Sequence, residues 1–293
     1  MNRNGSWGRN RSVARRGGIT VTLIGALLAA GVANAQTEPV LIPAWDAGDE
    51  SNTAQIDHGA WQEILDGYLR THDSGINRVD YASLKASAED SGKLSDYLDH
   101  LQGLDPRHYS RVEQQAYWIN FYNALTVKVI VDAYPVDSIR EISESMLAVG
   151  GLIPIGPWGD VRANVAGLDL TLDNIEHGIL RPIYGDSRIH YAVNCASLGC
   201  PNLLPAAFTA DNVESLLEAG ARDYVNHLRG VDFVDEDFIV ISSIYDWWVD
   251  DFGGTEAGVM EHLVRYADED LAEQLRVFEG AVEYEYDWAL NQP

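Results

Sequence analysis

The segment from Ala116 to Ala133 constrains the fold more than any other part of the chain, because it is apolar on nearly every side over about five helical turns. A surface helix shows one apolar stripe, so a helix that is apolar all round has to be surrounded by protein. Ser110 is a favourable N-cap with Glu113 three residues later, and Tyr134-Pro135 provides a stop. We therefore predict a central buried helix from about Ser110 to Tyr134.

The remaining periodic segments predict a mixed, helix-rich fold. We expect further helices at about residues 61–69, 94–101, 172–180, 211–227, 244–252 and 255–266, and strands at 188–194, 231–234 and 238–242. Strands and helices do not alternate regularly, which favours an α+β class over a parallel α/β class. We predict a helix-rich single α+β domain with a small, mostly antiparallel sheet, for which a papain-like arrangement is one candidate.

The first 35 residues have the pattern of a secretory signal peptide. A basic stretch is followed by an apolar run from Ile19 to Val32 and by Ala33-Asn34-Ala35, which suits cleavage after Ala35. We expect a periplasmic or secreted protein with an acidic linker at residues 36–54 and one domain at residues 55–291. Since no later stretch approaches the length of a membrane span, we predict no membrane insertion after cleavage.

The net charge of the chain limits the classes of molecule that it can bind. Its 20 Lys+Arg and 45 Asp+Glu give a formal net charge of −25, and loss of the five arginines in the signal peptide changes this to −30. Such an excess repels nucleic-acid phosphates and anionic membranes, so we predict no nucleic-acid partner. We expect a peptide-like or small-molecule substrate. No P-loop, GxGxxG or GxSxG motif occurs, and we predict no cofactor.

The chain has two cysteines, Cys195 and Cys200. Cys195 ends a predicted strand and opens a loop that contains Ser, Gly and Pro, a common location for a reactive group. Two interpretations are equally favoured: a structural disulfide across this loop, as expected of an exported protein, or a nucleophilic or redox-active Cys195. They overlap, because a disulfide that forms reversibly is itself an activity.

A thiolate nucleophile needs a neighbouring base. His177 lies away from the buried stripe of its predicted helix, and Asp173, one turn earlier, can hold its imidazole. The alternative is that His177 is a solvated helix residue with an acidic neighbour. His190 is the weaker partner, because an odd separation from Cys195 on a regular strand places the two side chains on opposite faces.

Asn120 and Asn123 lie three residues apart on the buried helix, so their amides must be hydrogen-bonded. They either bind irregular backbone, such as the loop at residues 151–159, or one of them orients the histidine or stabilises an oxyanion. A mixed zinc site made by Glu176-His177, His190 and Cys195 is disfavoured, since neither HExxH nor paired CxxC spacing occurs. We predict no metal.

Together these segments resemble the "domain of unknown function 547" family from about Trp61 to Asn291. The resemblance rests on Tyr117-Trp118-Ile119-Asn120-Phe121-Tyr122-Asn123-Ala124, Tyr134-Pro135, Ser138-Ile139-Arg140, Ile175-Glu176-His177, Ile179-Leu180-Arg181, Asn194-Cys195-Ala196-Ser197, Cys200-Pro201, Ser242-Ser243-Ile244, Trp247, Asp250-Asp251-Phe252-Gly253 and Asp287-Trp288-Ala289-Leu290-Asn291. The family has no agreed reaction. Some eukaryotic members carry the region beside a glutaredoxin-like domain, which favours thiol chemistry.

The leading hypothesis is an exported thiol-dependent acyl or amide hydrolase or transferase. Cys195 would be the nucleophile and His177 the base, and Asn120 or Asp173 would hold the imidazole. Cys200, Asn123, Asn194 and His190 would support the site. The alternatives are a non-catalytic cell-envelope binding or scaffold domain with a permanent Cys195–Cys200 disulfide, and a dithiol/disulfide exchange protein.

Overall fold

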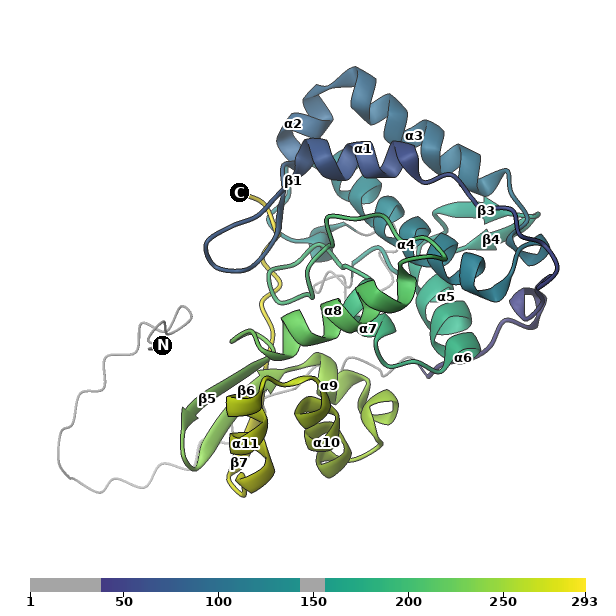
Figure 1. Cartoon of the computed structure of the whole chain (residues 1–293). Helices are drawn as coiled ribbons and strands as arrows, with labels where there is room; N and C mark the ends of the chain where they lie inside the picture. The colour runs from purple at the N-terminus through teal and green to yellow at the C-terminus, as the bar shows by residue number, and fades with distance from the viewer. Residues whose placement is uncertain (1–37, 143–155) are drawn as a thin grey trace, which may run out of the picture. The chain divides into compact units, whose positions relative to one another are not determined.

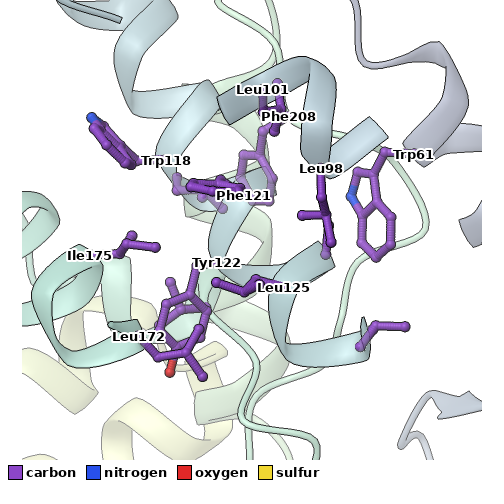
Figure 2. Packing of buried hydrophobic residues seen from close by; sticks show 14 of the residues in the cluster. Trp61, Leu98, Leu101, Trp118, Phe121, Tyr122, Leu125, Leu172, Ile175 and Phe208 are labelled. Atoms are coloured by element: carbon purple, nitrogen blue, oxygen red, sulfur yellow. The ribbon is translucent and has the colours of Figure 1, made fainter. Parts of the chain in front are cut away.

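Helix α4 (Arg111–Ala133) forms the centre of the larger core, as the sequence predicts. The structure is a computed structural model and describes residues 38–142 and 156–293; the predicted signal peptide lies outside these residues. The Ser110 hydroxyl accepts a hydrogen bond from the Glu113 amide, and the helix ends at Tyr134, before Pro135. Buried side chains project from α4 on all sides (Figure 2).

Helices dominate the described residues, with short strands between them (Figure 1). The α-helices are α1 (Gly59–Tyr68), α2 (Tyr81–Ala86), α3 (Ala88–Gln102), α4, α5 (Leu172–Ile175), α6 (Arg181–Tyr184), α7 (Ile189–Ala192), α8 (Val213–Val225), α9 (Ile244–Trp247), α10 (Glu256–Tyr266) and α11 (Glu269–Val277). The 3-10 turns are η1 (Pro43–Trp45), η2 (Pro106–His108), η3 (Ile139–Glu141) and η5 (Val249–Phe252), and η4 (Glu176–Leu180) is π-helical. In the described part of the chain, no helix is both long and apolar enough to cross a membrane.

Side chains from α1, α3 and α5 pack around α4 to form the larger core (Figure 2). Trp61, Leu98 and Leu101 come from the helices that precede α4, and Leu172 and Ile175 come from the helix that follows it. All are buried. Burying one such side chain contributes roughly 1.5–3 kcal/mol, so this cluster supplies much of the driving force for folding.

The N-terminal segment before residue 55 is packed on the domain. Trp45 is buried and meets the ring of Trp118 edge-on at 5.1 Å. The Ile42 amide donates to the Gly178 carbonyl at 2.9 Å. The described part of the predicted linker therefore belongs to the folded unit rather than to a spacer.

A second core joins α8, α10 and α11 to a three-stranded sheet. Its strands are β5 (Val231–Asp235), β6 (Phe238–Ser242) and β7 (Ala281–Glu285), in the order β5-β6-β7. The predicted strands at residues 231–234 and 238–242 are confirmed as β5 and β6, which pair antiparallel, whereas β7 pairs with β6 in parallel. Two further antiparallel pairs are β1 (Leu69–Arg70) with β2 (Arg78–Val79) and β3 (Ala163–Val165) with β4 (Leu168–Leu170). The helix-rich α+β class with small, mostly antiparallel sheets is confirmed.

The predicted strand at residues 188–194 is wrong, because the chain there forms the helical turn α7 and only then extends. All four residues of α7 are buried, and the Ala192 carbonyl accepts a hydrogen bond from Asn123 on α4. A short run of buried residues has no period that separates a strand from a helical turn, so the tertiary contacts decide. Because His190 is in this helical turn and not on a strand, the prediction that His190 and Cys195 lie on opposite strand faces is also wrong.

Candidate functional site

Cys195 and Cys200 lie side by side as free thiols at the two ends of one short loop. The Cys195 amide donates to the Cys200 sulfur at 3.0 Å, and the two thiols hydrogen-bond to each other. Cys195 is half-buried, whereas Cys200 is buried. Cys195 is thus the more exposed residue of the pair.

Two buried asparagines fix this loop. The Asn123 side chain donates to the Ala192 carbonyl at 2.9 Å and accepts from the Asn194 amide at 2.8 Å, which ties the loop to α4. The Asn194 side chain bridges the loop by donating to the Pro201 carbonyl and accepting from the Ala196 amide. Ala196 takes a left-handed φ of 61°, which is unfavourable for a residue with a side chain. The structure therefore places the predicted supporting residues Asn123 and Asn194 in the framework of the loop.

The C-terminal segment closes the other side of the loop. The Leu198 and Gly199 amides each donate at 2.8 Å, to the carbonyls of Ala289 and Asp287. A Cβ atom on Gly199 would lie 2.7 Å from the Asp287 nitrogen, so this close approach requires glycine. The pairing brings Tyr286 onto the sulfur atoms.

Two hydroxyl groups lie within hydrogen-bond distance of the Cys195 sulfur. The Tyr286 hydroxyl lies 3.0 Å from it, and the Ser197 hydroxyl lies 3.3 Å from it. The hydrogen bond from Cys200 is the largest cause that lowers the pKa of Cys195; Ser197 and Tyr286 add to it, while burial and the Glu176 carboxylate oppose it. Burial, and then Cys195 itself, raise the pKa of Cys200 well above its usual value. The two thiols therefore differ strongly in acidity.

His177 is buried, so the alternative of a solvated helix residue does not hold. Its Nδ1 lies 3.0 Å from the Arg181 guanidinium, which can only donate, so Nδ1 accepts and Nε2 carries the ring proton. Nε2 faces the Asp173 carboxylate at 3.8 Å, as the spacing predicts. Burial lowers the pKa of His177 to about 4, and burial raises the pKa of Asp173 to about 6. The two ring nitrogens of His177 thus face Arg181 and Asp173.

His190 is the centre of a buried charge cluster. Its Nε2 lies 2.6 Å from Asp251 and its Nδ1 lies 3.6 Å from Glu176, and Asp251 also accepts from Arg181 Nε at 2.6 Å. Burial disfavours the charged imidazole, but Asp251 and Glu176 outweigh this and raise the pKa of His190. His190 therefore lies between two carboxylates that favour its charged form.

The cluster sits at the π-helical turn η4, in which the Arg181 amide bonds to the Glu176 carbonyl five residues earlier. Such turns often occur at functional sites. Burial raises the pKa of Glu176, but His177, His190 and Arg181 together outweigh burial and lower this pKa to about 2. Trp248 covers the cluster: its ring stacks on His190 at 5.7 Å and lies under the Arg181 guanidinium at 4.6 Å. The negative charge of Glu176 raises the pKa of Cys195, so the cluster and the thiols are coupled electrostatically.

The Asn120 side chain hydrogen-bonds to the backbone of Phe208 and to neither histidine. Its side chain donates to the Phe208 carbonyl at 2.7 Å and accepts from the Phe208 amide at 3.0 Å. It binds irregular backbone, although at Phe208 rather than at residues 151–159, most of which lie outside the described residues. Among the described residues, no group of three His, Cys, Asp or Glu side chains is placed to hold a metal ion.

Sequence reasoning did not assign Tyr286, Glu176 or Asp251 to the thiol site, although Glu176 and Asp251 lie in motifs that carry the family resemblance. Glu176 carried a signal, because it adjoins His177 and is excluded from water on the same helix as Leu172 and Ile175. Asp251 stands in a run of acidic residues that looks like a solvated face. Tyr286 lies 91 residues from Cys195, and no local pattern points to it.

Comparison with known families gives one match. Residues 106–225 match the family model described as "Protein of unknown function, DUF547". Residues 106–225 are a DUF547 domain. The DUF547 match includes both cysteines and the helical segments with Glu176, His177 and His190. It is narrower than the resemblance from Trp61 to Asn291, so Asp251 and Tyr286 lie outside it. No curated protein and no solved structure gives a significant match to the chain.

Proposed function

We propose that this DUF547 protein is an exported thiol/disulfide exchange protein whose reactive pair is Cys195 and Cys200. The observation that carries the proposal is the adjacency of two free thiols of opposite character. Cys195 is half-buried with a lowered pKa, and Cys200 is buried with a raised pKa. An accessible thiolate and a shielded second thiol are the attacking and resolving groups that exchange requires.

The exchange proceeds in two balanced steps. The Cys195 thiolate attacks one sulfur of a substrate disulfide, whose S–S bond breaks, and the second substrate sulfur leaves as a thiolate that takes a proton from water. Cys200 then loses its proton to solvent and attacks the Cys195 sulfur, which releases the first substrate sulfur. Two electrons pass to the substrate, and the Cys195–Cys200 disulfide remains until an external thiol reduces it.

The first step prepares the second. While Cys195 is a thiolate, its hydrogen bond and its negative charge both raise the pKa of Cys200. Both effects end when Cys195 enters the mixed disulfide, so Cys200 becomes more acidic only when it is needed. The Cys195 amide, 3.0 Å from the Cys200 sulfur, is in place to stabilise the new thiolate.

The histidines favour exchange over a cysteine–histidine hydrolase. His177 accepts a hydrogen bond from Arg181 at Nδ1 and carries its own proton at Nε2, and His190 lies between two carboxylates that favour its protonated form. Neither offers a free lone pair to remove a proton from Cys195. The hydroxyls of Ser197 and Tyr286, together with the Cys200 thiol, stabilise the thiolate instead.

Aromatic side chains beside Cys195 suit a polypeptide substrate. Trp247, Tyr286 and Trp288 pack against one another at 4.6–5.5 Å between ring centroids, and each is half-buried. Half-exposed aromatic rings bind apolar side chains at little entropic cost. We therefore propose a peptide-like disulfide as substrate, with the protein acting outside the cytoplasm after removal of the predicted signal peptide.

The proposal is tested by the stoichiometry of reaction with dithiobis(nitrobenzoate), using the reduced protein and the matched variants Cys195→Ser and Cys200→Ser. The wild type is expected to release about two equivalents of thionitrobenzoate in two phases and to end as the internal disulfide. C200S should release about one equivalent and retain a mixed disulfide that mass spectrometry detects. C195S should lose the fast phase.

Three results would contradict the proposal. The first is a wild type that stops at the mixed disulfide, as C200S does. The second is a C195S variant that reacts as fast as the wild type. The third is wild-type turnover of an activated ester that C200S retains in full, which favours the hydrolase.

A further inference from the structure

Arg229 is a buried guanidinium beside the cysteine loop with unused hydrogen-bonding capacity. Its side chain is in the turn between α8 and β5, and the residue is 8% exposed. Nη1 donates to the Leu198 carbonyl inside the loop at 3.2 Å, but Nε and Nη2 are buried without an acceptor among the described residues. A buried donor without a partner costs about 1–3 kcal/mol, so this arrangement needs a reason.

The charge of Arg229 also has no ion-pair partner within 4 Å in the part of the chain that the structure describes. The guanidinium lies 5.2 Å from the centroid of the Tyr224 ring, and its charge interacts favourably with Cys200, Asp223 and Tyr286. The Asp223 carboxylate already accepts from Asn202 at 2.8 Å. A positive charge without an ion-pair partner is therefore held against the loop that carries the buried thiol.

The turn that carries Arg229 is rigid. The Arg229 amide donates to His227 Nδ1 at 3.1 Å, and the Gly230 amide donates to the His227 carbonyl at 2.8 Å. A Cβ atom on Gly230 would lie 2.0 Å from the Tyr224 carbonyl, so the turn is closed as tightly as glycine permits. The backbone position from which the guanidinium projects is thus fixed.

We propose that Arg229 stabilises the Cys200 thiolate that forms in the second step of exchange, and so speeds resolution of the mixed disulfide. This inference rests on the proposed function. In the second step Cys195 is covalently bound, so a negative charge appears at Cys200 in a site that excludes water, where a fixed positive charge is most effective. The described ionisable groups with the largest interactions with Cys200 include Cys195, Tyr81, Tyr122, Tyr224, Tyr286 and Arg229. Arg229 is the one cation in this set.

The test is the same two-phase reaction with dithiobis(nitrobenzoate), applied to Arg229→Met and Arg229→Lys, with Arg222→Met on exposed α8 surface as the matched control. Methionine removes the charge together with the unpaired donors at similar volume, so R229M should fold. We expect R229M to slow the second phase by about tenfold or more, which corresponds to a rise of one unit in the pKa of Cys200. The rate of the first phase should stay within about twofold of the wild-type rate. R229K should keep the second phase within about threefold of the wild type, and R222M should match the wild type.

The outcomes distinguish failure of the proposed exchange function from failure of the proposed role of Arg229. A wild type without a second phase overturns the proposed function, whatever Arg229 does. A two-phase wild type with an unchanged second phase in R229M overturns the role of Arg229, and so does an equal slowing of both phases, which indicates a purely structural role. If R229M fails to fold by circular dichroism, Arg229→Gln replaces it in the same comparison.

Discussion

Replacing Asp251 by asparagine is expected to lower the free energy of unfolding by about 3 kcal/mol. The Asp251 carboxylate accepts from both His190 and Arg181 at 2.6 Å, and it holds a much lowered pKa because these two cations outweigh its burial. Removing one member of a buried charge cluster leaves the other charges without compensation, and such changes cost about 3–5 kcal/mol. The partial exposure of Asp251 places its effect at the lower end of that range.

Urea unfolding followed by circular dichroism measures this effect, and Asp250→Asn is the matched control. Asp250 is the exposed neighbour of Asp251, so D250N should change stability by less than about 0.5 kcal/mol. Equal losses in D250N and D251N would show that the buried cluster contributes nothing specific to the fold.

Acidification from pH 7 to pH 4 is expected to destabilise the protein strongly. Burial lowers the pKa of His58, His177 and His262 to about 4 from an ordinary value of 6.5. Between these two values the unfolded chain binds protons that the folded chain does not, so stability falls as the pH falls. For the well-buried His58 and His177 the loss is about 2–3 kcal/mol each. Asp173 offsets part of this loss of stability. Its pKa of about 6 means that the folded state binds a proton at a higher pH than the unfolded state does.

The variant His58→Gln tests this window with little change in packing, since the glutamine amide can still bond to the Tyr97 hydroxyl that His58 meets at 2.7 Å. Urea unfolding at intervals between pH 7 and pH 4 should give a shallower pH dependence for H58Q, by about 2 kcal/mol over the range. His108→Gln changes an exposed side chain and serves as control. A pH dependence that is the same in H58Q as in the wild type would contradict the buried neutral state of His58.

The parts of the fold that the sequence predicts are those with long, strong periods. The all-round apolar pattern of α4 locates the larger core, and the N-cap at Ser110 and the stop at Tyr134 mark its ends within a residue or two. Strand β7 was missed because its pairing with β6 joins residues about forty positions apart and its exposed alternation is weak. Local patterns carry no information on such pairings.

The candidate site was predicted only in outline. The Cys195/Cys200 loop and the buried Asn123 follow from composition and burial, but the position of His177 was derived from a regular helix. The π-helical turn at Glu176–Leu180 changes the angle between successive side chains, so a residue expected outside the buried stripe lies inside the protein. The Tyr286 hydroxyl reaches Cys195 only because the C-terminal segment pairs with the loop, which no short motif reveals.

The central claim is that Cys195 and Cys200 form a reversible redox pair, and its reduction potential tests this most directly. The protein is equilibrated in glutathione buffers of graded ratio, quenched with an alkylating reagent and analysed by mass spectrometry. We predict a reversible two-electron transition between about −270 and −120 mV, the range of dithiols that exchange disulfides. A disulfide that stays oxidised below about −300 mV, as permanent staples do, or the absence of any Cys195–Cys200 disulfide across the titration, contradicts the claim.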